Sequence, residues 1–269
     1  MNAAGGGPIG VAVAGAAGRL GGAVLRRLAG DSRFTVTACL ERPGHAGLGR
    51  PPLADLAGLP ACVPDDGPWG SPRVFFDAGA AGAVAAHVRR AAGDGVALVV
   101  AVTGLPEAAE RELEAAARRV PVLVSPNLSL GVTVLAGLVR EAARRLPGYD
   151  VEIVEAHHAA KRDSPSGTAL WLGREAAAAR GWAWPDAARP GRQGAVGPRP
   201  EREIGIHSLR GGSAVGEHRV RLAGPGEHLE LAHVAESRDG FAAGALEALA
   251  LVARSGPGRY TMEDVTTGR

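Results

Sequence analysis

The stretch IGVAVAGAAGRLGGAVLRRLAG, residues 9–30, decides the fold. It opens on an uninterrupted apolar run, which is typical of a strand buried on both faces of a parallel sheet. Glycines follow, and the apolar residues then recur at helical spacing, at Leu20, Val24, Leu25 and Leu28. Gly30 can end that helix. The stretch therefore predicts a strand, a glycine turn and a helix.

The alternation of strand and helix continues to about residue 128. A second strand, FTVTACLE at 34–41, ends in an acid and completes a βαβ unit. Further strands are expected at RVFFDA (73–78), VALVVAVTG (96–104) and VPVLVSPN (120–127), separated by helical stretches at 82–92 and 106–119. This order predicts the α/β class, with a Rossmann-type, doubly wound parallel sheet.

The pattern changes after residue 128. Helices are expected at 129–146 and 166–180, a polar loop at 185–203, and strands at 149–158, 204–211, 217–224 and 227–237. Strands that follow one another through short turns predict a mixed sheet in a second, α+β domain. A last helix at 240–255 can pack back on the first sheet. We therefore predict one domain from residues 1–128 and 239–269 and another from 129–238.

Composition excludes several classes of protein. The 30 basic and 28 acidic residues leave a net charge of +2 and are scattered along the chain, which argues against a nucleic-acid or membrane partner. The longest apolar run, VALVVAV at 96–102, is too short to cross a membrane, and residues 1–10 do not resemble a signal peptide. Cys39 and Cys62 are expected to be packing groups in a reducing cytoplasm.

The glycine turn predicts a nucleotide site. The spacing Gly15-Ala-Ala-Gly18-Arg-Leu-Gly21 is a G-x-x-G-x-x-G variant of the dinucleotide fingerprint, and amides at a helix start can hold a pyrophosphate. Glu41, at the end of the second strand, can accept hydrogen bonds from the adenine ribose. Arg42 and Arg19 could instead pair with a 2′-phosphate, so NADH and NADPH both stay open. The alternative is a tight turn that only lets helix and sheet pack closely.

A second stretch, EAHHAAKRDSPSGTAL at 155–170, concentrates acid–base and anion-binding groups. It lies between an expected strand and an expected helix, so Ser166, Gly167 and Thr168 would begin that helix and could bind a carboxylate. Lys161 can add positive charge or donate a proton, and a histidine can exchange protons near neutral pH. The alternative is a simple N-cap beside a solvated loop. No metal site is predicted, because the adjacent histidines lack partners at ligand spacing.

This second stretch resembles the E-x-H-H-x-x-K-x-D-x-P-S-G-T-A signature of the 4-hydroxy-tetrahydrodipicolinate reductase (dihydrodipicolinate reductase) family. The resemblance extends over about residues 9–253 and includes VAVAGAAGRLGG, SPNLSLGV and the stretch EREIGIHSLRGGSAVGEHRVRLAGPGEHLELAHVAES. It implies NAD(P)H-dependent reduction of 4-hydroxy-tetrahydrodipicolinate, a cyclic dicarboxylate, to tetrahydrodipicolinate in the diaminopimelate route to lysine. It also implies a nicotinamide domain, a central substrate domain and a homotetramer.

The resemblance assigns roles to individual residues. His157 would be the proton donor and acceptor, and Lys161 the proton donor. The substrate carboxylates would be held by His158, Gly167 and Thr168, together with Ser166 at the predicted helix start. The cofactor would be held by Gly15, Ala16, Ala17, Gly18, Arg19, Leu20, Glu41 and Arg42, with Ala101, Val102, Thr103, Ser125, Pro126, Asn127 and Leu128 on the nicotinamide side.

Three segments on the nicotinamide side depart from the family pattern. FFDAGAA replaces the usual D-F-T or D-F-S, although Asp77 is kept. AVTG replaces G-T-T-G, which places a stiff β-branched Val102 in a loop that must approach the cofactor. SPNL replaces A-P-N-F or its Met variant. Two alternatives follow: a divergent paralogue that reduces a related cyclic imine, or a non-catalytic nucleotide-binding homologue.

Overall fold

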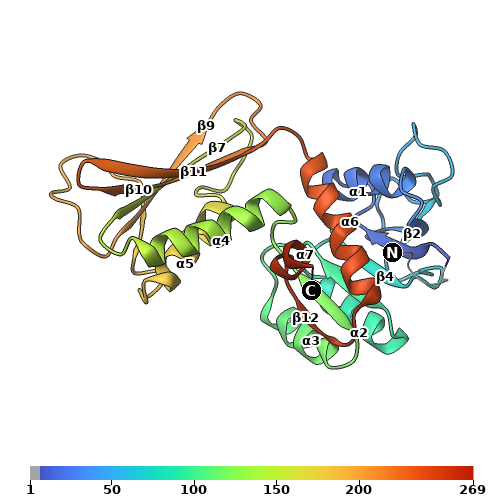
Figure 1. Cartoon of the computed structure of the whole chain (residues 1–269). Coiled ribbons are helices and arrows are strands. Elements are labelled where there is room, and N and C mark those ends of the chain that lie inside the picture. Colours follow the sequence, from blue (N-terminus) through green and yellow to red (C-terminus); the bar gives the residue numbers. More distant parts are fainter. Residues whose placement is uncertain (1–6, 269) are drawn as a thin grey trace. The chain divides into compact units, whose positions relative to one another are not determined.

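The computed structural model describes residues 7–268, which form two compact units (Figure 1). The first unit comprises the described chain up to Leu130 together with the chain from Asp239 onward, and the second comprises Gly131–Arg238. The predicted α/β class is confirmed, with a Rossmann-type parallel sheet in the first unit and a mixed sheet in the second.

The sheet of the first unit has seven strands, all paired in parallel. They are β1 (Ile9–Ala14), β2 (Phe34–Glu41), β3 (Cys62–Pro64), β4 (Val74–Asp77), β5 (Ala97–Val100), β6 (Pro121–Val124) and β12 (Gly258–Tyr260). Their order across the sheet is β12-β6-β5-β4-β1-β2-β3. The chain therefore reverses its direction of winding between β1 and β4, and in sheets of this kind ligands bind outside the carboxyl ends of the strands at that point.

Helices cover both faces of this sheet. The helices α1 (Arg19–Ala29) and α6 (Asp239–Arg254) share one apolar cluster with the sheet, while α2 (Val84–Asp94) and α3 (Glu107–Ala117) share the other (Figure 1). Val11 and Val13 contribute to the first cluster, and Ala12 and Ala14 to the second. Burial on both faces is why β1 is an uninterrupted apolar run.

The second unit is a five-stranded mixed sheet with helices on one face (Figure 1). Its strands are β7 (Asp150–His157), β8 (Ala188–Pro190), β9 (Ile204–Arg210), β10 (Gly216–Gly224) and β11 (Glu227–Ala235), in the order β11-β10-β7-β9-β8. β7, β9 and β8 pair in parallel, whereas β10 and β11 are antiparallel. The helices α4 (Leu130–Arg145) and α5 (Gly167–Ala179) pack on the apolar face through Leu135, Val139 and Leu172.

The sequence pattern does not predict four short elements, namely β3, β8, β12 and the final helix α7 (Met262–Thr267). The three strands have three residues each, too few to show a period, and β8 falls inside the stretch expected to be a loop. β3 brings Cys62 beside Cys39, and both are buried free cysteines. Burial raises the pKa of the Cys39 thiol to about 12, which keeps it protonated and apolar in character.

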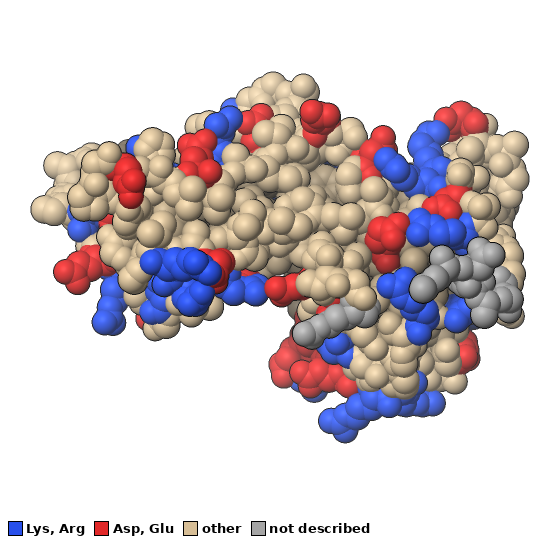
Figure 2. Space-filling model, in the orientation of Figure 1, with Lys and Arg blue, Asp and Glu red and all other residues tan. Residues whose placement is uncertain are grey.

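The surface is mixed in charge. Figure 2 shows lysine and arginine side chains interspersed with aspartate and glutamate over the visible face. Within residues 7–268, no helix has the length and apolar character needed to cross a membrane. Among the large apolar side chains that remain more than half exposed are Leu209 on β9 and Val234 on β11.

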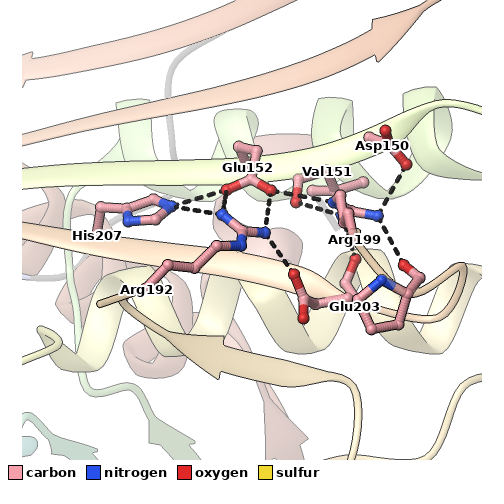
Figure 3. A network of polar contacts seen from close by, with 8 residues as sticks. Asp150, Val151, Glu152, Arg192, Arg199, Glu203 and His207 are labelled. Carbon is pink, nitrogen blue, oxygen red and sulfur yellow. Dashed lines mark hydrogen bonds and ion pairs between the residues drawn. The ribbon is translucent and has the colours of Figure 1, made fainter. Parts of the chain in front are cut away.

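A polar network holds the loop before β9 against the sheet face that the helices leave open (Figure 3). The Glu152 carboxylate accepts two hydrogen bonds from Arg192, at 2.6 and 3.0 Å, one from Arg199 at 3.1 Å and one from His207 at 2.7 Å. Arg199 also donates to Asp150 at 2.8 Å and to the Val151 carbonyl at 3.2 Å. Burial opposes ionisation, but these donors lower the pKa of Glu152 to about 2.

Gly205→Ala should disrupt this network. A β-carbon at position 205 would lie 1.9 Å from Oε2 of Glu152, so the carboxylate would have to leave its arginine partners. We expect the free energy of unfolding to fall by about 2–4 kcal/mol, measured by urea denaturation. Gly137→Ala in α4 is the matched control, because a β-carbon there meets nothing within 4 Å. Equal stability of the two variants would contradict this role for Gly205.

Candidate active site

The glycine turn lies at the carboxyl edge of the first sheet, at the switch point between β1 and β4. Gly15 follows β1 with φ +73°, and a β-carbon there would lie 2.4 Å from the Ala78 carbonyl oxygen. Gly18 is the N-cap of α1 and supplies no side chain, so the first amides of the helix stay accessible to a ligand. A β-carbon at Gly21 would lie 2.1 Å from the Gly15 carbonyl oxygen. The turn is thus a bare backbone cradle at a helix N-terminus.

Glu41 lies beside this cradle as the last residue of β2. Its Oε1 accepts a hydrogen bond from the Ala17 amide at 2.8 Å, and its side chain is buried. Glu41 therefore also shapes the turn, a role that the sequence pattern did not reveal. Arg42, which follows Glu41, and Arg19, the first residue of α1, are both exposed. Of the other predicted turn residues, Ala16 is buried, Leu20 half-buried and Ala17 exposed.

The predicted nicotinamide-side segments follow β5 and β6 on the same edge of the sheet. Val102 is buried in the apolar cluster of α2 and α3, so its side chain points away from the surface of the loop. Ser125 donates to the Asn127 carbonyl at 2.6 Å, and Asn127 Oδ1 accepts from the Ser129 amide at 2.8 Å. The remaining members range from buried to exposed: Leu128 is buried, Ala101 half-buried, and Thr103 and Pro126 exposed. The side chains of Ser125 and Asn127 are thus engaged in hydrogen bonds within the turn after β6.

A buried acid–imidazole pair supports the turn that touches Gly15. Asp77, at the end of β4, is fully buried; it contacts His87 Nδ1 at 2.8 Å and accepts from the Gly79 amide at 3.0 Å. Burial opposes the charged form of His87, but the carboxylates of Asp77 and Asp65 raise its pKa. Asp77 was recognisable as the acid kept in the family pattern, whereas nothing in the sequence pattern indicated His87, which lies ten residues further along the chain on α2.

In the second unit, β7 places Glu155 and His157 on the buried face of the sheet, two residues apart. His157 Nδ1 lies 2.6 Å from Oε2 of Glu155. Arg210, which pairs with His157 in the register of β7 and β9, donates to both carboxylate oxygens of Glu155 at 2.7 and 2.9 Å. Glu155 also accepts from the Ser166 amide at 3.0 Å, which ties the strand to the start of α5.

These contacts set the protonation of both groups. Glu155 is fully buried, which opposes its ionisation, but hydrogen bonds from Arg210, from His157 and from the Ser166 amide lower its pKa to about 2. The pKa of His157 is lowered, chiefly by burial and further by the charges of Lys161 and Arg210, while Glu155 opposes the shift. At neutral pH the pair is therefore a carboxylate beside a neutral imidazole.

The start of α5 completes this part of the site. Ser166 is the N-cap: its hydroxyl accepts from the Ala169 amide at 3.1 Å and lies 3.2 Å from His218 Nε2. Gly167 is exposed and Thr168 half-buried in the first turn, the position from which helix amides bind anions. The Ser166 hydroxyl thus caps α5.

Lys161 and His158 lie on the loop between β7 and α5. The Lys161 ammonium pairs with the Asp163 carboxylate at 2.8 Å, and the Asp163 carbonyl accepts from Arg210 at 2.7 Å. His158 is half-buried, and its amide donates to the Ala214 carbonyl at 2.8 Å. The structure therefore brings His157, Lys161 and the α5 N-terminus onto one scaffold, whose centre is Glu155 and Arg210.

Three partners in this site, Glu155, Arg210 and His218, were not predicted from the sequence. Glu155 could have been predicted, because it lies two residues before His157 on a strand and both side chains must therefore point to the same face of the sheet. Arg210 and His218 could not, because their positions depend on which strands pair with β7. In the part of the chain that the structure describes, no group of three or more histidine, cysteine or acidic side chains could hold a metal ion.

A backbone cradle at the switch point of a parallel sheet, with a separate unit that carries an imidazole, an ammonium and a helix N-terminus, defines a two-domain, nucleotide-dependent oxidoreductase. Two family models, for the N-terminus and the C-terminus of dihydrodipicolinate reductase, match residues 9–128 and 131–266. The chain belongs to the dihydrodipicolinate reductase family, and it is an NAD(P)H-dependent oxidoreductase.

Curated relatives support this membership, and solved structures share the fold. A 4-hydroxy-tetrahydrodipicolinate reductase of Anaeromyxobacter sp. (strain Fw109-5) is 46% identical over 260 residues, covering 96% of this chain and 97% of the relative. That of Rubrobacter xylanophilus is 45% identical over 258 residues, covering 95% and 97%. A dipicolinate-bound dihydrodipicolinate reductase from Paenisporosarcina sp. TG-14 has a TM-score of 0.75 at 23% identity, covering 94% of this chain and 97% of that one. An amine dehydrogenase from Mycobacterium smegmatis shares the fold with a TM-score of 0.58 at 14% identity, covering 95% of each chain.

Proposed function

We propose that this protein reduces 4-hydroxy-tetrahydrodipicolinate to tetrahydrodipicolinate with NADH or NADPH, in the diaminopimelate route to lysine. The observation that carries the proposal is the scaffold in the second unit, where Glu155 and Arg210 hold His157, the Lys161 loop and the α5 N-terminus together. This arrangement suits an anionic substrate whose carboxylates bind at a helix start beside proton-exchanging side chains. The curated relatives carry the name of this activity.

The residues divide the work between the two units. Amides at the start of α5, with Gly167, Thr168 and His158, would hold the substrate carboxylates, while Lys161 and His157 would handle protons. In the overall balance, one hydride and one proton enter and the hydroxyl leaves as water. The bound dihydronicotinamide supplies the hydride, and the protein supplies orientation and charge.

The first unit fits a dinucleotide. The turn at Gly15 and Gly18 presents backbone in place of side chains, and Glu41, the last residue of β2, would accept hydrogen bonds from a ribose. Ala101–Thr103 and Ser125–Leu128 would line the nicotinamide side, mainly through backbone. Because Val102 packs into the core, its β-branched side chain does not crowd this side.

A coupled assay tests the proposed activity. Aspartate semialdehyde, pyruvate and the preceding synthase generate the substrate, and we expect oxidation of NADH or NADPH, followed as loss of absorbance, on addition of this protein. Cofactor binding without turnover would favour a paralogue that acts on a related cyclic imine, which the altered AVTG and FFDAGAA segments make worth testing. Cofactor binding without turnover of any cyclic imine would favour the non-catalytic nucleotide-binding homologue, and failure to bind either cofactor would contradict the proposed function.

Arg42→Ala should change the preference between cofactors. Arg42 is exposed beside Glu41 at the ribose end of the predicted site, where a guanidinium can pair with a 2′-phosphate. We expect KM for NADPH to rise about tenfold, with KM for NADH nearly unchanged, because a charge-assisted contact contributes about 1.5 kcal/mol. Equal changes with the two cofactors would contradict a specific contact to the 2′-phosphate.

We also propose a cytoplasmic homotetramer. Leu209 and Val234, more than half exposed, lie on the face of the second sheet that α4 and α5 leave open, which supports burial of this face against other copies. The buried free cysteines suit a reducing compartment. Light scattering coupled to size-exclusion chromatography measures the assembly, and a monomeric mass would contradict the tetramer.

A further inference from the structure

We infer that Glu155, held by Arg210, is a positioning residue that fixes the proton of His157 on Nδ1 and leaves Nε2 as a hydrogen-bond acceptor toward the substrate. The inference rests on the proposed function for its kinetic consequences, but its structural content concerns only side chains of the second unit. Glu155 and Arg210 thereby gain an orienting role toward His157 that their residue types alone did not indicate.

The tautomer follows from the chemistry of the contact. A carboxylate can only accept hydrogen bonds, and Nδ1 of His157 lies 2.6 Å from Oε2 of Glu155. Nδ1 must therefore carry a hydrogen. Glu155 is held as a carboxylate by bidentate donation from Arg210 and by the Ser166 amide at 3.0 Å. A neutral imidazole with its proton on Nδ1 has a lone pair at Nε2.

The surroundings of the ring keep Nε2 accessible and the ring uncharged. A β-carbon at Gly216 would lie only 3.1 Å from Nε2, so glycine leaves the space beside this nitrogen open. The charged neighbours are Glu155 on β7, Arg210 on β9 and Lys161 on the loop before α5. The fourth titratable neighbour, His218 on β10, meets the His157 ring edge-on at 5.4 Å. Burial lowers the pKa of His218 to about 4, so it adds no charge near neutral pH.

This geometry separates the roles of the two proton-handling groups. In its resting form His157 accepts a hydrogen bond at Nε2, for example from the hydroxyl of the substrate, and Lys161 is the donor. When Nε2 gains a proton, the Glu155 carboxylate is in place to stabilise the imidazolium, as an acid does for the histidine of a hydrolase triad. Arg210 links the two groups, because it also donates to the Asp163 carbonyl of the loop that carries Lys161.

A spectroscopic measurement on the unmodified protein tests the tautomer directly. Nitrogen-15 NMR of protein labelled on its histidine rings distinguishes protonated from unprotonated ring nitrogens, and His157→Asn identifies the signals of His157. We expect a protonated Nδ1 and an unprotonated Nε2 at neutral pH. A proton on Nε2 in place of Nδ1 would overturn the inference, whether or not the protein shows the proposed activity.

Glu155→Gln tests the kinetic consequence. We expect kcat to fall about 10–100-fold, with a smaller change in KM. Losses of this size are typical when a hydrogen-bond partner that orients a functional side chain is removed. Glu155 raises the pKa of His157, so the loss of its charge lowers that pKa. If activity needs the neutral ring, the acidic limb of the kcat/KM profile must then move to lower pH.

Glu152→Gln is the matched control. Glu152 lies on the same strand, three residues earlier; it pairs with two arginines and a histidine, and its pKa is likewise lowered to about 2. Both variants should lose stability, but only Glu155→Gln should alter the NMR signals of His157 and the acidic limb. Identical behaviour of the two variants would overturn the inference, whereas absence of turnover in the unmodified protein would count against the proposed function alone.

Discussion

Replacing Lys161 with alanine should lower kcat by about 10²–10⁴-fold, the usual contribution of a positioned general acid. The Lys161 ammonium lies on the loop between β7 and α5 and is held by Asp163 at 2.8 Å, close to the scaffold of Glu155 and Arg210. Since its partner is on the same loop and the side chain is partly exposed, its removal should not unfold the protein. The coupled assay measures kcat, and circular dichroism checks the fold.

Two further variants separate chemistry from charge at this position. Lys161→Arg keeps a positive charge but replaces the ammonium by a group that does not give up its proton, so we expect KM to be largely retained and kcat to stay low. Arg162→Ala removes a charge from the adjacent, exposed position and should leave kcat within about twofold. A turnover of Lys161→Ala close to that of Arg162→Ala would show that Lys161 is not the donor.

The first sheet could be predicted from sequence because its central strands are buried on both faces. Each is a short apolar run between glycine turns and helical stretches, and β1, β2 and β4 begin and end within a residue of the expected positions. The edge strands β3 and β12 could not be predicted in this way. They are three residues long, and pairing with β2 and β6 decides their conformation more than their own composition does.

In the candidate site, too, the residues within one short stretch could be predicted, whereas those brought to it by strand pairing could not. The stretch 155–170 contains the imidazole, the ammonium and the helix start, so its residue types predict the chemistry. Its geometry depends on Arg210 and His218, which reach it through the pairing of β7 with β9 and β10. The periodicity of the sequence does not indicate which strands pair or in which register. The reacting groups, His157 and Lys161, could therefore be predicted, but the orienting groups, Arg210 and His218, could not.

The fold explains the sequence differences from the family pattern on the nicotinamide side. Val102 replaces a small polar residue of the family pattern, and its side chain joins the apolar cluster under α2 and α3. Ser125, Asn127 and Ser129 bond to one another within the turn after β6. In the proposed binding mode these segments contact the cofactor mainly through their backbone, so we expect the side-chain changes to affect packing more than cofactor binding.

Gly15→Ala should have the largest effect on cofactor binding. Gly15 has φ +73°, which alanine adopts only with strain, and an added β-carbon would lie 2.4 Å from the Ala78 carbonyl oxygen. The contact is with backbone on both sides, so no side-chain rotation can relieve it. Either the turn after β1 or the turn after β4 must shift, and Ala17 would then lose its hydrogen bond to Glu41.

We therefore expect affinity for NADH and NADPH to fall about 100-fold or more, since a displacement of about 1 Å in a binding element can have an effect of that size. Fluorescence titration of the reduced cofactor measures the affinity, and thermal unfolding measures the accompanying loss of stability. Gly93→Ala in α2 is the matched control within the same unit, because a β-carbon there meets nothing within 4 Å and alanine favours the helix. Affinity of Gly15→Ala within threefold of that control would show that the cofactor phosphates bind elsewhere, even though the backbone cradle, the helix start and Glu41 all converge on this turn.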